Sequence, residues 1–231
     1  ELEIDTNRIF WPRVIDMNDR TLRQVSIGLG GPATGVTRSE RFDITAASEV
    51  MAILSLSKSY DDLRERLGRI IVAESNSGKP VTAEDLGAAG SMALLLREAM
   101  LPNLVQTLEG NPAFVHCGPF ANIAHGNSSI IADELALSRS DYVVTEAGFG
   151  AEMGAEKALH IKSLASGISP SCIVLNVTVR SMKLHGGGVA GGGGSRPTKE
   201  EIETENVEAV RSGASSNLRR HIKNLAATSI P

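Results

Sequence analysis

Cysteine is scarce in this sequence, and so are aromatic side chains. The 231 residues include two cysteines and only 3% aromatic residues. Two cysteines cannot form a disulfide scaffold, and their small number indicates a reducing, cytoplasmic compartment. Neither sign of charge is in large excess, because the formal net charge is −4, so no global basic field points to nucleic acid. No apolar run approaches the roughly 20 residues of a membrane helix. The 42% hydrophobic content is too high for a disordered chain.

Complete nucleotide-binding and zinc motifs are also missing from the sequence. Gly28–Ala33 has the form G-x-G-x-x-A, but Pro32–Thr37 holds breakers and β-branched residues where a dinucleotide site needs a helix. Ser77–Pro80 resembles the end of a P-loop, yet it lacks the first glycine, and a proline replaces the Ser or Thr that binds Mg²⁺. We interpret both segments as turns. His116 and Cys117 have no second Cys or closely spaced His to complete a zinc set.

The first part of the chain predicts short strands mixed with capped helices. Capping residues and breakers mark the ends of these elements. The predicted elements are a strand at Leu22–Gly28, a helix at Ala46–Ser57 capped by Asp43 or Thr45, a helix between Ser59 and Gly68, a strand at Arg69–Ala73, a turn at Asn76–Pro80, and a helix from Thr82 to about Met100. We interpret residues 1–110 as a mixed α/β region.

A regular alternation of strands and helices begins near Asn111. The predicted elements are strands at Ala113–Cys117, Asp141–Thr145 and Cys172–Val179, and helices at Ser128–Ser138 and Gly154–Ala165, the last ended by Gly167. Strands that are apolar on both faces and alternate with helices predict a parallel sheet covered by helices. Residues 111–188 would form this core, with Cys172 buried in it. A glycine-rich loop at 189–198, including Gly191–Gly194, and a helical continuation at 199–231 would follow. Thr198 and Glu201 would cap a helix running to about Arg211, and Asn217–Ala226 would form the last helix.

Ligands of such sheets bind beyond the carboxyl ends of the strands, so the segments that follow the strands are the candidate sites. The segment after the strand Cys172–Val179 holds the densest group of functional side chains: Arg180, Lys183, His185, Gly186, Gly187 and Gly188. Two cations and an imidazole can neutralise phosphate charge, and glycine amides can approach an oxyanion closely. The pattern indicates a phosphate or anion site, and a solvated basic loop is the alternative.

Polar residues follow the other two predicted strands as well. Glu146 lies among glycines at a strand tip, where a nucleotide enzyme places a Mg²⁺ ligand or a water-orienting carboxylate, although it could simply cap the next helix. Asn122 and His125 lie at a helix entrance, where amide and imidazole groups can orient a polar ligand. Helix capping explains Asn127 and Ser128, but it explains neither Asn122 nor His125.

Several long motifs, in order along the chain, together resemble the formate–tetrahydrofolate ligase (formyltetrahydrofolate synthetase) family. They are Trp11–Arg20, Phe42–Ala52, Pro102–Glu109, Gly118–Gly126, Thr145–Lys157 and Val177–Gly187. The resemblance implies a P-loop NTPase-like fold, with a parallel sheet covered by helices on both faces and part of an inserted mixed α/β domain. It also implies a homotetramer. Asp43 and Glu49, in the second motif, are expected to help orient the substrate.

The resemblance further implies a reaction in two steps. ATP phosphorylates formate to formyl phosphate, N10 of tetrahydrofolate then attacks the formyl carbon, and phosphate leaves. Mg²⁺ and a monovalent cation, K⁺ or NH₄⁺, would be required. Arg180, Lys183, His185 and Glu146 would be catalytic, and the glycines Gly186–Gly188 would hold formyl phosphate. No covalent enzyme intermediate is expected, which agrees with the lack of a convincing Ser or Cys nucleophile.

The family's P-loop would precede Glu1, and its main folate-stacking aromatics would follow Pro231. We therefore expect an internal fragment that is inactive by itself. Two alternatives remain open. The chain could belong to a non-catalytic folate- or nucleotide-binding or assembly module derived from the enzyme. It could instead belong to another P-loop kinase with a different acid acceptor.

Overall fold

The computed structural model describes residues 2–188 and 197–231. The chain forms two compact units. Unit 1 comprises the described residues up to Gly148 together with Lys157–Gly167, and unit 2 comprises Phe149–Glu156 together with the described part of Ile168–Pro231. The predicted glycine-rich loop at 189–198 lies almost entirely outside the described residues. No helix in the described ranges has the length and apolar character needed to span a bilayer.

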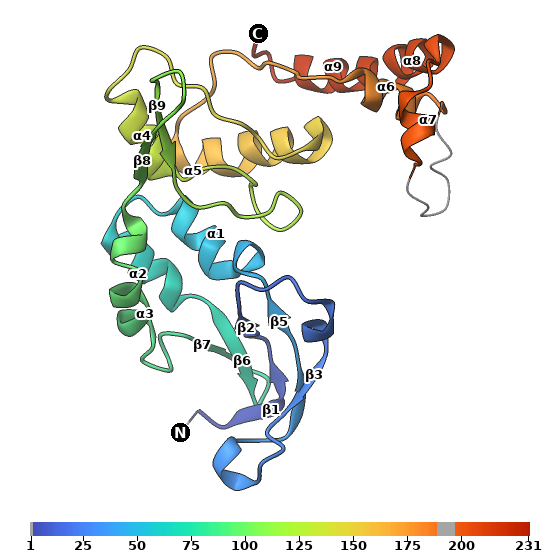
Figure 1. Ribbon diagram of the computed structural model, residues 1–231. Helices are drawn as coiled ribbons and strands as arrows, with labels where there is room; N and C mark the ends of the chain where they lie inside the picture. Colours follow the sequence, from blue (N-terminus) through green and yellow to red (C-terminus); the bar gives the residue numbers. More distant parts are fainter. Residues whose placement is uncertain (1, 189–196) are drawn as a thin grey trace. The chain divides into compact units, whose positions relative to one another are not determined.

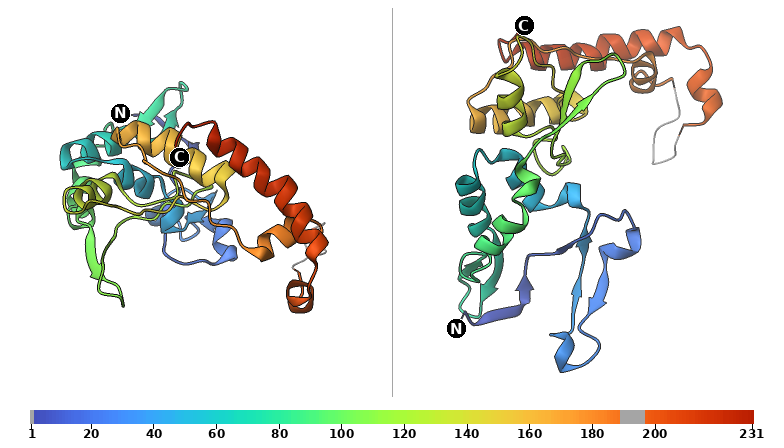
Figure 2. Two further views of the ribbon diagram at one scale, coloured as in Figure 1. Left: turned by 90° about the horizontal axis from the view of Figure 1, so that it is seen from above. Right: turned by 60° about the vertical axis from the view of Figure 1, so that its left-hand side comes forward.

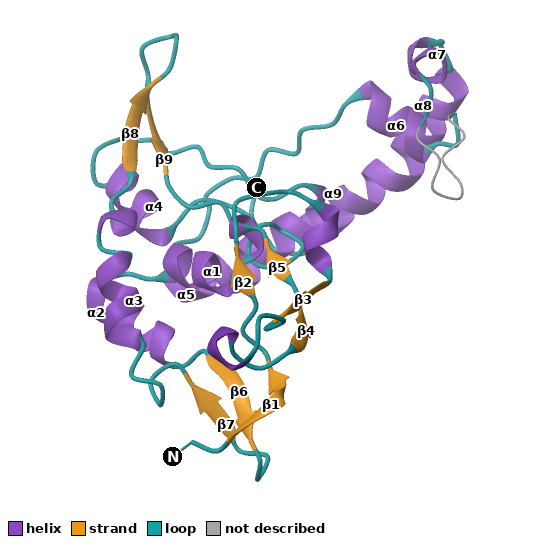
Figure 3. Cartoon of the chain, turned by 60° about the horizontal axis from the view of Figure 1, so that its bottom comes forward, coloured by secondary structure: helices purple, strands orange, loops and turns teal. Residues whose placement is uncertain are grey.

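Unit 1 contains small sheets, most of them antiparallel (Figures 1 and 3). The central strand β6 (Ile71–Ser75) pairs antiparallel with β1 (Ile4–Ile9) and with β7 (Pro80–Thr82). The two-stranded pairs are parallel β2 (Arg13–Val14) with β5 (Phe42–Asp43), antiparallel β3 (Val25–Ile27) with β4 (Arg38–Glu40), and antiparallel β8 (Asn103–Gln106) with β9 (Pro112–Val115). The predicted turn at 76–80 joins β6 to β7, and Gly78 adopts φ +77° there.

Serine side chains begin three of the helices of unit 1. Ser48, Ser59 and Ser129 each accept a hydrogen bond from the backbone N–H three residues later, which satisfies a donor that has no partner within the helix. The helices are α1 (Glu49–Leu56), α2 (Tyr60–Gly68), α3 (Ala89–Leu95), α4 (Ile130–Leu137) and α5 (Leu164–Ser166). Short 3₁₀ turns are η1 (Arg20–Arg23), η2 (Pro32–Thr34), η3 (Thr45–Ala47) and η4 (Glu98–Met100), and η6 (Ala158–Ser163) is a π-helical turn.

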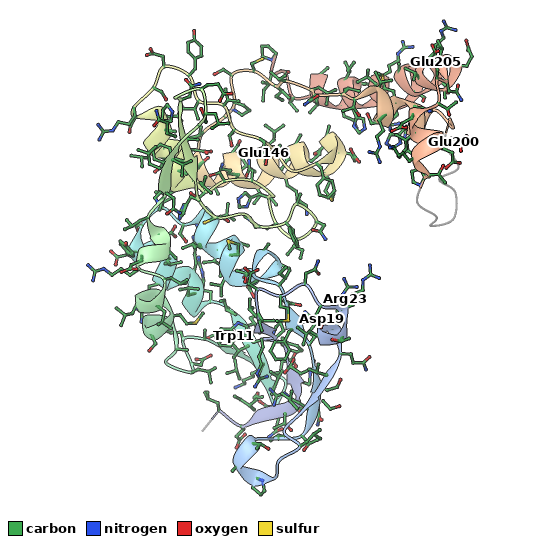
Figure 4. The ribbon with its side chains drawn as sticks, viewed as in Figure 1. Trp11, Asp19, Arg23, Glu146, Glu200 and Glu205 are labelled. Carbon is green, nitrogen blue, oxygen red and sulfur yellow. The ribbon has the colours of Figure 1, made fainter. Side chains whose placement is uncertain are left out.

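The core of unit 1 lies between α1, α2 and the β6–β7 hairpin. Leu63 and Leu67 lie one turn apart on α2, and both are 0% exposed. They pack with Ile70, Val72 and Val81, and Trp11 covers the edge of this cluster (Figure 4). Burial of such side chains stabilises a fold by about 1.5–3 kcal/mol each, so this cluster is the main support of unit 1.

Unit 2 is helical, with α6 (Val179–His185), α7 (Lys199–Glu203), α8 (Val207–Gly213) and α9 (Arg219–Ala226). The π-helical turns η5 (Gly150–Ala155) and η7 (Ala214–Leu218) also belong to it, and η7 joins α8 to α9 in one continuous helical path (Figure 2). Glycines let α6 and α8 approach closely. A Cβ atom on Gly186 would lie 1.7 Å from the Ala209 carbonyl oxygen, and one on Gly213 would lie 1.9 Å from that of Met182.

The structure is α/β with small mixed sheets, and it corrects the strands predicted for the second half of the chain. Ala113–Cys117 corresponds to β9, which pairs antiparallel with β8 rather than in a parallel sheet. Asp141–Thr145 and Cys172–Val179 are not strands, and Val144 and Val174 are 97% and 88% exposed. Cys172 is exposed, so its prediction as a core residue was wrong. A strand requires a ladder of hydrogen bonds to a neighbouring strand, and the bond from the Ile173 N–H to the Pro231 carbonyl oxygen at 2.7 Å does not make one.

Several predicted helix boundaries were also wrong. The cap of α1 is Ser48, because η3 occupies the residues predicted as its first turn. Thr82 and Asp85 exchange hydrogen bonds as predicted, but they close a turn, and the helix starts only at Ala89. The predicted loop Arg180–Gly188 is mostly the helix α6, because the Thr178 side chain accepts from the Ser181 N–H and caps it. The helix after Thr198 ends at Glu203, and α8 continues from Val207.

Candidate functional site

The loop Gly118–Gly126 follows β9 and is held in unit 1 by backbone contacts. Its Phe120 N–H donates to the Ala46 carbonyl oxygen at 2.9 Å, and its Ala124 N–H donates to the Phe120 carbonyl oxygen at 2.8 Å. Gly126 adopts φ +73°, and a Cβ atom there would lie 2.4 Å from Ala121 Cβ. The loop therefore closes tightly on itself, which only glycine permits at its last position.

The residues before this loop are fixed by a buried histidine. His116 Nδ1 lies 2.6 Å from Ser129 Oγ, and His116 Nε2 lies 2.7 Å from the Ala99 carbonyl oxygen. Because a carbonyl oxygen only accepts, Nε2 carries the hydrogen. The next residue, Cys117, has φ +57°, an uncommon backbone conformation for a residue other than glycine. The loop thus begins from a rigid, strained residue, a feature that occurs often at functional sites.

His125 lies inside unit 1, while Asn122 lies on the exposed side of the same loop. The His125 side chain is 0% exposed, and neither ring nitrogen has a hydrogen-bond partner. Burial is the main reason that its pKa falls to about 4, and the positive charge of Lys162 lowers it further. Backbone groups of Asn127 and Ser128 act in the opposite direction, but neither completes a hydrogen bond to the ring. His125 is therefore a neutral imidazole near pH 7.

Three further candidates of unit 1 lie on other segments. Asp43 ends β5 and forms an ion pair with Arg41 at 3.1 Å. Glu49 begins α1, and partial burial raises the pKa of its carboxyl group. Glu146 is exposed on the segment that was predicted to follow a strand (Figure 4). The structure thus places these carboxylates on separate elements.

The candidates of unit 2 lie on α6 and at its end. Arg180 and His185 are exposed, but Lys183 is only 4% exposed. The Lys183 ammonium group donates to the carbonyl oxygens of Glu201, Ile202 and Thr204, which lie at the end of α7. It therefore satisfies helix-terminal acceptors that would otherwise lack partners.

The glycines after α6 have separate structural explanations. Gly186 and Gly188 pack against α8, where added Cβ atoms would meet Ala209. Gly187 adopts φ +82° with open space around it, as a turn requires. A pocket of about 300 Å³ borders Lys183 and Gly188, but carboxylates line it, including Glu200 and Glu205 (Figure 4). These negative charges oppose phosphate in this pocket, and of the α6 candidates only Arg180 and His185 present a cation and an imidazole to solvent.

Comparison with known proteins identifies the family. Residues 1–231 match the family model described as "Formate--tetrahydrofolate ligase". The chain belongs to the formate–tetrahydrofolate ligase family. It is 55% identical over 231 residues to the formate–tetrahydrofolate ligase of Granulibacter bethesdensis, covering 100% of this chain and 39% of that protein. It is also 54% identical over 224 residues to the ligase of Desulforamulus reducens, covering 96% of this chain and 39% of that protein.

The ligase of Paracoccus denitrificans is 55% identical over 230 residues, which cover 100% of this chain and 40% of that protein. The chain therefore spans about two fifths of the length of these curated relatives. The family match runs through both compact units, so the candidate residues of unit 1 and of unit 2 all lie within the matched segment.

The family resemblance implies Mg²⁺, which oxygen ligands would have to hold. In the ranges 2–188 and 197–231, no three His, Cys, Asp or Glu side chains gather as metal ligands. Glu146, the predicted Mg²⁺ ligand, offers a single exposed carboxylate. Mg²⁺ requires near-octahedral oxygen coordination, often through one or two carboxylates and substrate phosphates. The described residues do not build such a site.

Two lysines of this ligase-family chain have contacts that the sequence did not predict, although Lys157 ends the motif Thr145–Lys157. Lys157 Nζ donates to the Ala121 carbonyl oxygen at 2.5 Å, inside the loop Gly118–Gly126. Lys162 Nζ lies 2.5 Å from Asp133 Oδ2, and both side chains are largely buried. Two lysines five positions apart do not lie on one face of an α-helix, so α-helical periodicity did not point to them. Asp133 within a predicted helix was an equally weak signal.

Proposed function

We propose that this chain supplies a central part of a formate–tetrahydrofolate ligase. The intact enzyme would transfer the γ-phosphoryl group of ATP to formate, giving formyl phosphate and ADP. N10 of tetrahydrofolate would then form a bond to the formyl carbon, while the carbon–oxygen bond to phosphate breaks and 10-formyltetrahydrofolate is released. The observation that carries this proposal is the family match over residues 1–231, with 55% identity to a named ligase across the whole chain.

Each unit by itself offers exposed residues that are candidates for contact with a substrate. Arg180 and His185 offer a cation and an imidazole for the negative charge of formyl phosphate, and Gly187 leaves its backbone open to an anion. Asn122 would orient a polar ligand from the loop Gly118–Gly126, with His125 acting from the interior. We keep Lys183, Glu146, Asp43 and Glu49 as candidates, and for Lys183 the carbonyl contacts favour a supporting role. Positioning and charge stabilisation would supply the catalysis.

We also propose the finer family properties for the intact enzyme. These are a P-loop NTPase-like parallel sheet, a homotetramer, a requirement for Mg²⁺ and for K⁺ or NH₄⁺, and a cytoplasmic location. The apolar segments Asp141–Thr145 and Cys172–Val179, which are not strands in this chain, are candidates for strands of that sheet in the intact enzyme. Val144 and Val174 are exposed in this chain, and helices that cover both faces of a parallel sheet would bury them.

A chimera would test the proposed activity. In this chimera, our chain replaces the matching segment of the Granulibacter bethesdensis ligase, and the unchanged host protein is the reference. We expect ATP- and formate-dependent production of 10-formyltetrahydrofolate at a rate comparable with that of the host. The Paracoccus denitrificans ligase serves as a second host, so that misfolding in one host does not decide the result. Folded chimeras that make no product would contradict the proposal. Nucleotide or folate binding without turnover would instead support a binding module, and turnover with another acid would support a different kinase.

Within the active chimera, Arg180→Ala should lower kcat on the order of 100-fold, because a charge that stabilises the transferred group is lost. Arg69→Ala is the matched control, since Arg69 is an exposed arginine in a surface ion pair with Glu65. We expect the control to retain the chimera's activity. Equal activity of both variants would remove Arg180 from the site.

A further inference from the structure

The loop Gly118–Gly126 has an inner and an outer side. Phe120, Asn122 and Ile123 are exposed, whereas Ala121 is only 4% exposed. The Ile123 N–H donates to the Phe120 carbonyl oxygen at 3.0 Å, which closes a tight turn of the chain here. Ala121 is therefore the inner residue of this turn, and the side chains that can meet a substrate stand directly beside it.

Contacts from three directions hold this turn in place. The Phe120 N–H donates to the Ala46 carbonyl oxygen at 2.9 Å, which ties the turn to η3. Gly126 approaches so closely that an added Cβ atom would lie 2.4 Å from Ala121 Cβ. Lys157 Nζ donates to the Ala121 carbonyl oxygen at 2.5 Å. Of these three contacts, the one from Lys157 is made by a charged side chain.

The hydrogen bond from Lys157 joins two segments that are 36 residues apart. Lys157 ends the motif Thr145–Lys157, and Ala121 lies within the motif Gly118–Gly126. A hydrogen bond from an ionised donor is roughly twice as strong as one between neutral groups. The bond therefore restrains the turn at its inner residue.

The segment that carries Lys157 is itself anchored in unit 1. Lys157 immediately precedes η6 and is the first residue of the second segment of unit 1. Within η6, Lys162 Nζ lies 2.5 Å from Asp133 Oδ2 of α4, and the two side chains are only 5% and 15% exposed. Breaking a buried ion pair is strongly destabilising, so this pair fastens η6 to α4. Lys157 thus reaches the turn from a segment that is fixed by a separate contact.

We propose that Lys157 is a positioning residue of the ligase, which places the Asn122 side chain by holding the Ala121 carbonyl oxygen. The inference rests on the proposed function, in which Asn122 orients a polar ligand. Asn122 directly follows Ala121, so a shift of the turn at Ala121 moves the amide group of Asn122 with it. A misplacement of about 1 Å can slow an enzyme on the order of 100-fold. Lys157 itself touches no substrate in this scheme.

The test uses the active chimera. Lys157→Met removes the hydrogen-bond donor but keeps a long side chain. We expect kcat to fall on the order of 10–100-fold, because a displaced turn no longer orients the reactants. The value of kcat/KM for formate should fall to the same extent, as the loss of an interaction made in the transition state predicts. Lys79→Met is the matched control, because Lys79 is exposed in the turn between β6 and β7, and it should leave turnover unchanged.

Two conservative variants grade the restraint on the turn. Lys157→Arg keeps a charged donor and should recover most of the turnover. Lys157→Gln keeps a neutral and weaker donor, so its kcat should lie between those of the Arg and Met variants. Lys157→Gln also keeps the proposal testable if Lys157→Met does not fold. Equal turnover of the Arg, Gln and Met variants would contradict a role for the hydrogen bond.

A double-mutant cycle shows whether Lys157 acts through Asn122. Asn122→Ala alone should lower kcat, because the orienting amide is lost. In Lys157→Met the amide is already misplaced, so adding Asn122→Ala should lower kcat little further. A purely structural role for Lys157 would give effects that multiply. Multiplied effects, or unchanged kcat in Asn122→Ala alone, would overturn the proposal.

Hydrogen exchange supplies a readout that does not depend on turnover. The amides of Phe120, Ile123 and Ala124 are hydrogen-bonded in the turn, so their exchange reports its opening. We expect exchange about tenfold faster in Lys157→Met, with unchanged rates in α2. Unchanged exchange of the three amides would overturn the positioning role. An unmodified chimera that lacks ligase activity would instead defeat the proposed function, and the exchange experiment would still decide whether Lys157 holds the turn.

Discussion

At the scale of single residues, chemistry-bearing side chains were easier to recognise than the residues that support them. His125 stood out in the sequence because helix capping could not explain it. Lys162 did not, because its buried ion pair with Asp133 joins elements far apart in the sequence and lies on a π-helical turn that α-helical periodicity cannot predict. Lys183 shows the opposite error. It was selected as a cation beside glycines, but its ammonium group is occupied by the carbonyl oxygens at the end of α7.

The buried neutral His125 should make the stability of the protein depend on pH. Its pKa is about 4 in the folded chain, against an ordinary value of 6.5. The unfolded state therefore binds more protons between these values, and stability should decrease as the pH falls from about 6.5 to about 4. The slope from this residue is at most about 1.4 kcal/mol per pH unit. Urea unfolding of the chimera at pH values from about 4 to about 7 would measure this slope. His125→Phe should flatten the dependence, and an equally steep slope in that variant would contradict the assignment.

At the scale of elements, local signals predicted helix ends better than strands. The Ser59 and Thr198 caps were confirmed, and Thr198 forms a full capping box with Glu201. Gly167 ends its helix at φ +80°, as predicted. These features depend on residues a few positions apart. The strands predicted at Asp141–Thr145 and Cys172–Val179 depend on distant partners, and apolar composition alone cannot supply the hydrogen bonds that define a strand.

The crossing of α6 and α8 provides a test at this scale. Gly213→Ala would place a Cβ atom 1.9 Å from the Met182 carbonyl oxygen, so the helices must separate. We expect a loss of about 1–3 kcal/mol, as overpacking usually causes, seen as a lower unfolding midpoint and faster exchange in α6. Gly90→Ala is the control, because Gly90 lies in α3 with no atom within 4 Å of an added Cβ. That change should stabilise α3 by about 0.5–1 kcal/mol. Equal effects of the two substitutions would show that the close approach of α6 and α8 is not required.

At the scale of the whole molecule, the family could be identified from the order of its motifs, while the architecture could not be predicted to the same extent. The order of the motifs can be read directly from the sequence, and the family match over residues 1–231 confirmed the predicted family. Sheet topology depends on which strands pair, and β8 with β9 forms an antiparallel hairpin where a parallel strand was expected. One view of this hairpin shows it extending from the helices of unit 1 (Figure 2), and Leu104 and Val105 on it are exposed. The prediction of the family and that of the topology thus rest on different information.

The ligase reaction should not occur in this chain alone. Its 231 residues contain no Walker A sequence, so they lack the lysine and backbone cradle that hold the β- and γ-phosphates of ATP in P-loop enzymes. Purified chain incubated with ATP, formate and tetrahydrofolate should produce no 10-formyltetrahydrofolate above a protein-free blank, under conditions in which the chimera is active. Far-UV circular dichroism would establish that the chain is folded during the assay. Product formation by the folded chain would mean that phosphoryl transfer proceeds without a P-loop, and Arg180 and His185 would then become the first residues to test as the phosphate-binding groups.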